Sequence, residues 1–297
     1  TLVGGTLVLQ GNGSVAASSR VLLANGFFDV SATSAGASIS GLAGAGIVTI
    51  GSQSLTITHA NDSFGGAIIG TGGLILNGGT QALTGSNTYT GVTTINGGTL
   101  AMAGGGTLAP GAAIALNGSG ATFDISAAGT QTIATLDGVV GSRMALGANS
   151  LNLDGGTFAG GFAGTGILYK QGATVFTVNG DSSAFAGQTI VMAGTLAVGD
   201  ANSPGAVLGG NVAVDPQAKL QGHGSIGGNI INDGTVAPGG SIGTLTVAGN
   251  YAQTATATLS IEVSPTDASL LKVGGNASLG GTLALIYDPG TYSAHQY

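Results

Sequence analysis

The sequence predicts an all-β fold in which parallel strands stack as a solenoid, a parallel β-helix. Three observations predict it: glycine supplies 59 of the 297 residues, the helix formers glutamate and lysine are scarce, and short apolar strands recur between glycine and asparagine residues. The glycines follow no three-residue period, which excludes collagen. A hydrophobic content of 43% excludes a disordered linker.

The chain repeats itself at two scales, and the repeats decide the architecture. The larger period is about 95 residues, because residues 84–91 match residues 179–187. The smaller units hold about 20–25 residues each, with two or three strands per unit. One such unit cannot bury its apolar side alone, so units must stack on one another. We therefore expect about 12–14 turns.

The recurring strand pattern ends in Leu-x-Leu followed by Asn-Gly, as at residues 74–78. Its apolar residues face inward and its polar residues outward. The glycine then turns the corner, because it tolerates positive φ. A pair of β-sandwiches is the alternative, but sandwiches favour antiparallel hairpins with two-residue turns. The fixed long period argues against them.

Charge and composition exclude several functions. The net charge of −7 leaves no basic stripe for nucleic acid, and anionic membrane surfaces would repel the chain. The absence of cysteine excludes disulfides and thiolate metal sites. No apolar stretch is long enough for a membrane-spanning helix. The chain opens without a charged leader, so we expect no signal peptide, and we expect both ends to continue into a longer protein.

Residues 86–100, Ser-Asn-Thr-Tyr-Thr-Gly-Val-Thr-Thr-Ile-Asn-Gly-Gly-Thr-Leu, resemble the passenger-associated transport repeat of bacterial autotransporters. A weaker copy runs from Asp181 to Leu196, and a degenerate third at residues 61–67 lacks the Tyr-Thr-Gly core. From about Thr195 onward the chain resembles the autochaperone region of that family. The segments that carry this second resemblance are residues 222–228, 238–245, 249–251, 270–277 and 280–283.

The resemblance implies a right-handed β-helix, exported through the periplasm and outer membrane to the bacterial cell surface or beyond. Its partner would be its own C-terminal β-barrel translocator, and its last turns would fold first as a template. We accordingly divide the chain into β-helix passenger coils at residues 1–194 and terminal coils with an autochaperone-type cap at residues 195–297. No nucleic acid or small-molecule substrate is expected.

The function implied is a rigid stalk or adhesin, with a host-cell, matrix or self-association partner. The alternative is the non-catalytic stalk of an autotransporter enzyme, a protease or esterase, whose active domain lies upstream. A third hypothesis is a non-secreted, glycan-active β-helix enzyme. Such an enzyme would need paired carboxylates facing one groove, and aspartates scattered singly along the chain give no such sign.

One Gly-x-Ser-x-Gly match, at residues 239–243, invites a hydrolase triad with the nearby His223 and Asp233. That motif works on a strand-to-helix turn, and no helical pattern follows Ser241. We therefore interpret Ser241 as a turn residue. We expect no catalytic, cofactor-binding or metal-binding residues in this chain.

The remaining candidates have simple structural interpretations. His59, His223 and His295 are isolated, without ligand spacing, and no Gly-Gly-x-Gly-x-Asp calcium repeat occurs. Phe64, Tyr89 and Phe185 occupy equivalent corner positions, and we expect each to pack over its own corner. A carbohydrate-binding platform is the alternative for these rings.

An apolar block follows residue 244 and is the candidate folding template. Its members are Leu245, Val247, Tyr251, Leu259, Ile261, Val263, Leu270, Val273, Leu279, Leu283, Leu285 and Ile286.

We expect deletion of residues 245–287 to slow the refolding of the remaining chain and to lower its yield. The first turn to form has no neighbour and needs extra stabilisation. Recovery of the β-sheet circular dichroism signal after dilution from denaturant measures both quantities. Refolding as fast and as complete as that of the intact chain would contradict the prediction.

Overall fold

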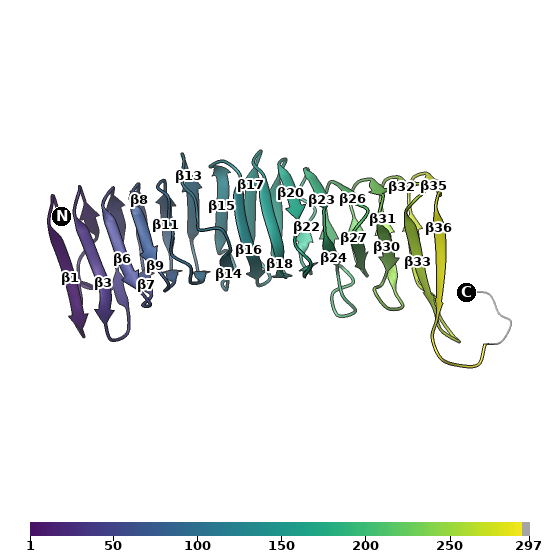
Figure 1. Ribbon diagram of the computed structural model, residues 1–297, viewed down its shortest axis with the longest axis horizontal. Coiled ribbons are helices and arrows are strands. Elements are labelled where there is room, and N and C mark those ends of the chain that lie inside the picture. The colour runs from purple at the N-terminus through teal and green to yellow at the C-terminus, as the bar shows by residue number, and fades with distance from the viewer. Residues whose placement is uncertain (293–297) are drawn as a thin grey trace. The chain divides into compact units, whose positions relative to one another are not determined.

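The computed structural model describes residues 1–292 and confirms an all-β architecture, with parallel strands stacked as a β-solenoid of about 13 turns (Figure 1). These residues contain no helix, and therefore none long and apolar enough to cross a membrane. The chain forms two compact units, Thr1–Leu151 and Asn152–Tyr297. The boundary predicted at residue 194 concerns the autochaperone region and stays a prediction.

Three parallel sheets form the faces of the first unit. The first sheet contains β1 (Thr6–Gly11), β3 (Phe27–Thr33), β6 (Ile47–Gly51) and β9 (Ala67–Gly70). The second contains β4 (Ala37–Ile39), β7 (Leu55–Ile57), β10 (Leu74–Leu76), β12 (Thr93–Ile95), β14 (Ala112–Leu116) and β16 (Gln131–Gly138). The third contains β2 (Val21–Leu23), β5 (Leu42–Gly44), β8 (Ala60–Phe64), β11 (Gly79–Leu83), β13 (Thr99–Ala103), β15 (Thr122–Ala127) and β17 (Arg143–Gly147).

The second unit has the same plan of three faces. One face contains β18 (Leu151–Phe158), β21 (Val175–Val178), β24 (Gly194–Val198), β27 (Ala218–Gly222), β30 (Thr235–Pro238), β33 (Thr258–Val263) and β36 (Thr282–Tyr287). The next contains β20 (Ile167–Lys170), β23 (Gln188–Val191), β26 (Asn211–Val214), β29 (Ile230–Asn232), β32 (Tyr251–Gln253) and β35 (Ala277–Ser278). The last contains β22 (Asp181–Ser182), β25 (Val207–Leu208), β28 (Ser225–Ile226), β31 (Thr244–Val247) and β34 (Leu270–Val273), and β19 (Gly161–Gly164) precedes it.

The strand register gives the length of each turn. Leu74 pairs with Leu55 (74 − 55 = 19), and Thr93 pairs with Leu74 (93 − 74 = 19). Turns in the second unit vary more, since Ala277 pairs with Tyr251 (277 − 251 = 26). The register confirms the short sequence period and places insertions in the corners between strands.

Alternation along each strand builds the core. In β10, Leu74 and Leu76 are buried and Ile75 between them is half-buried. Five phenylalanines of the apolar strands are all buried: Phe28, Phe123, Phe158, Phe162 and Phe176.

The phenylalanines of the second unit form a cluster around Phe162. Its ring centroid lies 4.8 Å from that of Phe158, 6.1 Å from that of Phe176 and 6.3 Å from that of Phe185. The contacts with Phe158 and Phe176 are edge-on, and such pairs add to the stabilisation from area burial alone.

The apolar block that follows residue 244 divides into two parts. Leu245, Val247 and Tyr251 are fully buried. Leu279 is 67% exposed and Leu283 is 61% exposed, because no further turn stacks over them among the described residues. The structure does not show the predicted autochaperone-type cap.

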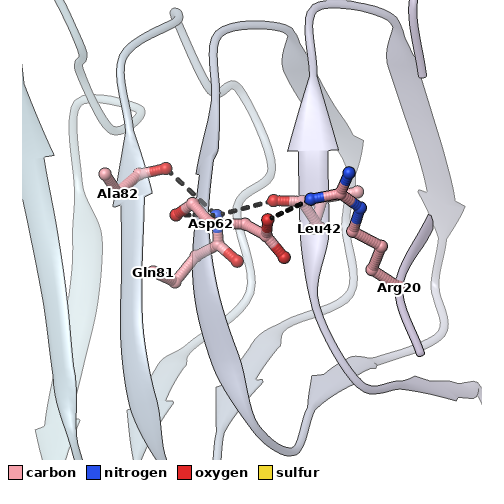
Figure 2. A network of polar contacts seen from close by, with 5 residues as sticks. All are labelled: Arg20, Leu42, Asp62, Gln81 and Ala82. Atoms are coloured by element: carbon pink, nitrogen blue, oxygen red, sulfur yellow. Dashed lines mark hydrogen bonds and ion pairs between the residues drawn. The ribbon is translucent and has the colours of Figure 1, made fainter. Parts of the chain in front are cut away.

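An ion pair ties three turns of the first unit together on its surface (Figure 2). Arg20 Nη1 donates to Asp62 Oδ1 at 3.1 Å, and Gly41 lies in the turn between them. A Cβ on Gly41 would lie against Asp62 Oδ2. Glycine at this position therefore leaves the carboxylate free to reach the arginine.

A buried amide, that of Gln81, crosses an overlapping set of turns (Figure 2). Gln81 Nε2 donates to the carbonyl oxygens of Leu42 at 2.9 Å, Asp62 at 3.2 Å and Ala82 at 3.1 Å. One side chain thus contacts the backbone of three successive turns. These bonds compensate for burying the Nε2 group, whereas Oε1 is buried without a hydrogen-bond partner among the described residues.

We expect Gly41→Ala to destabilise the chain by about 1–3 kcal/mol, because the added methyl group overpacks the site and displaces the Asp62 carboxylate. Gly105→Ala is the matched control, since a Cβ there meets nothing within 4 Å; its effect should stay within about 0.5 kcal/mol. Urea unfolding midpoints measure both. Equal midpoints for the two variants would contradict the role assigned to Gly41.

Candidate functional site

The Gly-x-Ser-x-Gly segment connects two strands. It follows β30 and leads into β31, and Gly239 and Gly240 take φ values of 83° and 79°. Two consecutive residues in this region of φ space require glycine. A nucleophile elbow needs a helix after the serine, and a strand follows Ser241 instead.

The other two triad candidates do not form a hydrogen-bonded relay with Ser241 among residues 1–292. His223 Nε2 lies 3.3 Å from the carbonyl oxygen of Ile242. The His223 ring occupies the space that a Cβ on Gly243 would fill. Asp233 is held through its backbone N–H, which donates to the Val214 carbonyl at 2.8 Å. The histidine ring therefore packs against the turn.

Several of the scattered aspartates close local turns. Each of four carboxylates accepts the backbone N–H two residues further on, at 2.8–2.9 Å; these are Asp29, Asp124, Asp181 and Asp200. Such Asx turns are a common use of aspartate at corners. Within residues 1–292, no three His, Cys, Asp or Glu side chains gather to hold a metal ion. His59 is an exposed residue between β7 and β8, and His295 lies outside the described residues.

The corner of the first predicted transport repeat contains two buried polar contacts. Asn87 is buried; its Oδ1 accepts the N–H of Ile68 at 3.1 Å, and its Nδ2 donates to the Gly85 carbonyl at 3.0 Å. The Tyr89 hydroxyl lies 2.6 Å from Thr93 Oγ1, and both residues are buried. Burial raises the pKa of Tyr89 well above its usual range, and the hydrogen bond with Thr93 offsets only part of this rise. Tyr89 therefore stays protonated.

The second repeat has the same corner with smaller polar groups. Ser182 takes the place of Asn87, and its Oγ accepts the N–H of Phe162 at 3.0 Å. Phe185 replaces the tyrosine, and Thr189 lies four residues later, as Thr93 does after Tyr89. Without the phenol, Thr189 Oγ1 is buried and has no hydrogen-bond partner among the described residues.

The three corner aromatics pack inside the solenoid. Phe64 is 0% exposed, and Tyr89 and Phe185 are each 1% exposed. The rings of Phe64 and Phe185 each fill the space where a Cβ would stand on the glycine two residues later. No ring face is open to a sugar, so the carbohydrate-platform interpretation does not fit this structure.

Sequence reasoning missed one pair of carboxyl groups. Glu262 on β33 lies close to Asp288, which follows β36. Burial raises the pKa of Glu262, Asp288 raises it further, and Lys219 lowers it. A cavity of about 120 Å³ beside Glu262 is lined by Lys219, Pro238, Ser260 and other residues.

Sequence reasoning also missed a buried lysine. Lys170 is fully buried, and its ammonium group donates to the carbonyl oxygens of Gln171, Gly172 and Ala193. Burial lowers the pKa of Lys170, and the nearby Asp154 offsets part of this shift. The three carbonyls satisfy all three donors, so Lys170 connects two turns.

The two repeat corners yield a matched pair of substitutions. We expect Tyr89→Phe to destabilise the chain by about 1–2 kcal/mol, because Thr93 Oγ1 would lose its partner. We expect Phe185→Tyr to stabilise the chain by up to about 1 kcal/mol by supplying the hydroxyl that Thr189 lacks. Urea unfolding measures both. Changes of opposite sign in the free energy of unfolding would support the view that the two corners are equivalent. A stabilising effect of Tyr89→Phe would contradict that view.

Comparison with known proteins adds one finding. The passenger-associated-transport-repeat family model matches residues 69–102 and 168–198. These matches cover both corners described above. No curated protein matches the chain, and no solved structure matches it. Two such repeats within a parallel β-solenoid fit an autotransporter passenger.

Proposed function

We propose that this fragment is a rigid stalk or adhesin of an autotransporter passenger, exposed on the bacterial surface or secreted. Membership of the transport-repeat family implies a surface or secreted location and a translocator partner. The observation that best supports a stalk is that the polar side chains of the repeats are buried and form hydrogen bonds within the solenoid. Asn87 and Ser182 are buried, and each accepts a backbone N–H from the preceding turn. The buried Tyr89 hydroxyl pairs with Thr93 within its own turn. The repeat side chains therefore serve the solenoid itself.

We further propose that the terminal turns template folding after translocation. In a solenoid each turn contacts only its neighbours, so folding can propagate from one stable turn to the next. A buried polar network in these turns supports the idea. Asn232 Nδ2 donates to the Tyr251 hydroxyl at 3.0 Å, and that hydroxyl donates to Gln253 Oε1 at 2.9 Å. Gln253 Nε2 then donates to the Thr282 carbonyl at 3.0 Å, so the network spans three turns.

The alternative remains a non-catalytic stalk whose enzymatic domain, a protease or esterase, lies upstream. Reading the upstream coding sequence distinguishes the two, since an enzyme domain there would assign this chain the supporting role.

Display on cells tests the adhesive part of the proposal. The chain, fused to an outer-membrane anchor, should increase cell aggregation or attachment to host cells or matrix proteins. Cells that display the anchor alone are the control, and antibody binding to an N-terminal tag confirms equal display. Equal adhesion by the two cell types at equal display would contradict the adhesin role and leave the stalk role.

A further inference from the structure

Four asparagines stand at the same corner of four successive turns in the second unit. Asn211, Asn229, Asn250 and Asn276 begin or directly precede β26, β29, β32 and β35. The backbone N–H of Asn229 donates to Asn211 Oδ1, that of Asn250 to Asn229 Oδ1, and that of Asn276 to Asn250 Oδ1, each at 2.8 Å. We call this set the asparagine ladder.

Each rung of the ladder is a two-point contact. The backbone of Asn250 donates its N–H to the Asn229 side chain and accepts the N–H of Ile230 at 2.8 Å. Asn276 does the same with Asn250 and Tyr251. The side chain always belongs to the earlier turn, and the backbone groups it complements belong to the later turn. The ladder therefore has a direction.

A glycine before the asparagine makes room for each rung. A Cβ on Gly228 would lie 2.5 Å from Asn211 Oδ1. Cβ atoms on Gly249 and Gly275 would lie against the Oδ1 atoms of Asn229 and Asn250. The φ angles of these glycines are not in the left-handed region, so space rather than backbone conformation requires glycine. Each rung of the ladder therefore requires the dipeptide Gly-Asn in the later turn.

Corners of the first unit with the reverse order, Asn-Gly, work differently. Asn96 Nδ2 donates to Asn77 Oδ1 at 2.8 Å, so the two side chains contact each other. The backbone N–H of Asn96 pairs instead with the Leu76 carbonyl. This pair lacks the side-chain-to-backbone contact of the ladder and offers a matched control.

The ladder removes an ambiguity in strand register. Alternation of apolar and polar residues opposes a slip of one residue, because such a slip turns every side chain to the other face. A slip of two residues keeps the alternation and is not opposed by it. The Gly-Asn corner opposes both slips, because the Oδ1 atom needs an N–H to accept and a neighbouring position without a Cβ.

We propose that the asparagine ladder sets the register as each of the turns that begin at Asn211, Asn229 and Asn250 folds onto the turn that follows it. A folded turn presents the N–H and C=O of its Gly-Asn corner, and the incoming turn docks its own asparagine there before its strands pair. The proposal rests on the templating function proposed above and identifies the residues that perform it.

Refolding kinetics of the full chain test this order of events. Asn229→Ala should slow refolding about five-fold and change the unfolding rate little, as expected for a hydrogen bond already formed in the transition state. Asn229→Asp keeps the acceptor and should refold at nearly the rate of the unaltered chain. Asn77→Ala, at an Asn-Gly corner of the first unit, should leave the refolding rate unchanged.

An Asn229→Ala variant that unfolds faster but refolds at the unaltered rate would overturn the proposal, because the ladder would then only stabilise the finished fold. If Asn229→Ala does not fold, the refolding rate of Asn211→Ala, at the end of the ladder, provides a second test. Deletion of residues 245–287 separates the two ideas. If the deletion impairs refolding while both alanine variants refold normally, templating stands and the register role of the ladder fails.

Discussion

Every turn of this solenoid depends on the turn beside it for its backbone hydrogen bonds. Parallel strands cannot pair within one turn, so Leu74 finds its partners in the turn before, at Leu55, and in the turn after, at Thr93. Neighbouring strands stack about 4.8 Å apart. At that spacing, corner residues stand directly over the carbonyl groups of the turn below. A Cβ on Gly66 or Gly79 would collide with such a carbonyl, at Gly46 or Ala60. Close stacking thus explains much of the glycine content.

The same constraint explains the polar residues in the interior. Corners leave carbonyl groups that no strand satisfies, and burying them without partners is costly. Lys170 and Gln253 each donate to several carbonyls at or beside corners, in more than one turn. Gln81 does the same with carbonyls inside β5 and β8. These side chains belong to the fold rather than to a binding site. The asparagine ladder applies the same chemistry in one direction at a single corner.

The fold could be predicted from the sequence because its signals are local. Leu-x-Leu strands, corner glycines and the repeat around Tyr89 are visible within a few residues of one another. The turn at Ser241 was predictable for the same reason, since Thr244–Val247 reads as a strand. Contacts between turns were not predictable, because turn length varies from 16 (235 − 219) to 26 (277 − 251) residues between paired positions. Glu262 and Asp288 come together across a long terminal turn, and the sequence around either residue does not indicate that the other lies nearby. The exposure of Leu279 and Leu283 depends on whether a further turn stacks over them, and the sequence pattern around these residues does not indicate this.

Direction of folding is the central claim, and pulsed hydrogen exchange during refolding of the intact chain tests it most directly. Templating from the terminal turns predicts that amides in β29 to β33 gain protection first, and that protection then spreads toward β21. Protection that begins in the phenylalanine cluster between Phe158 and Phe185, or that rises in all turns at once, would contradict it.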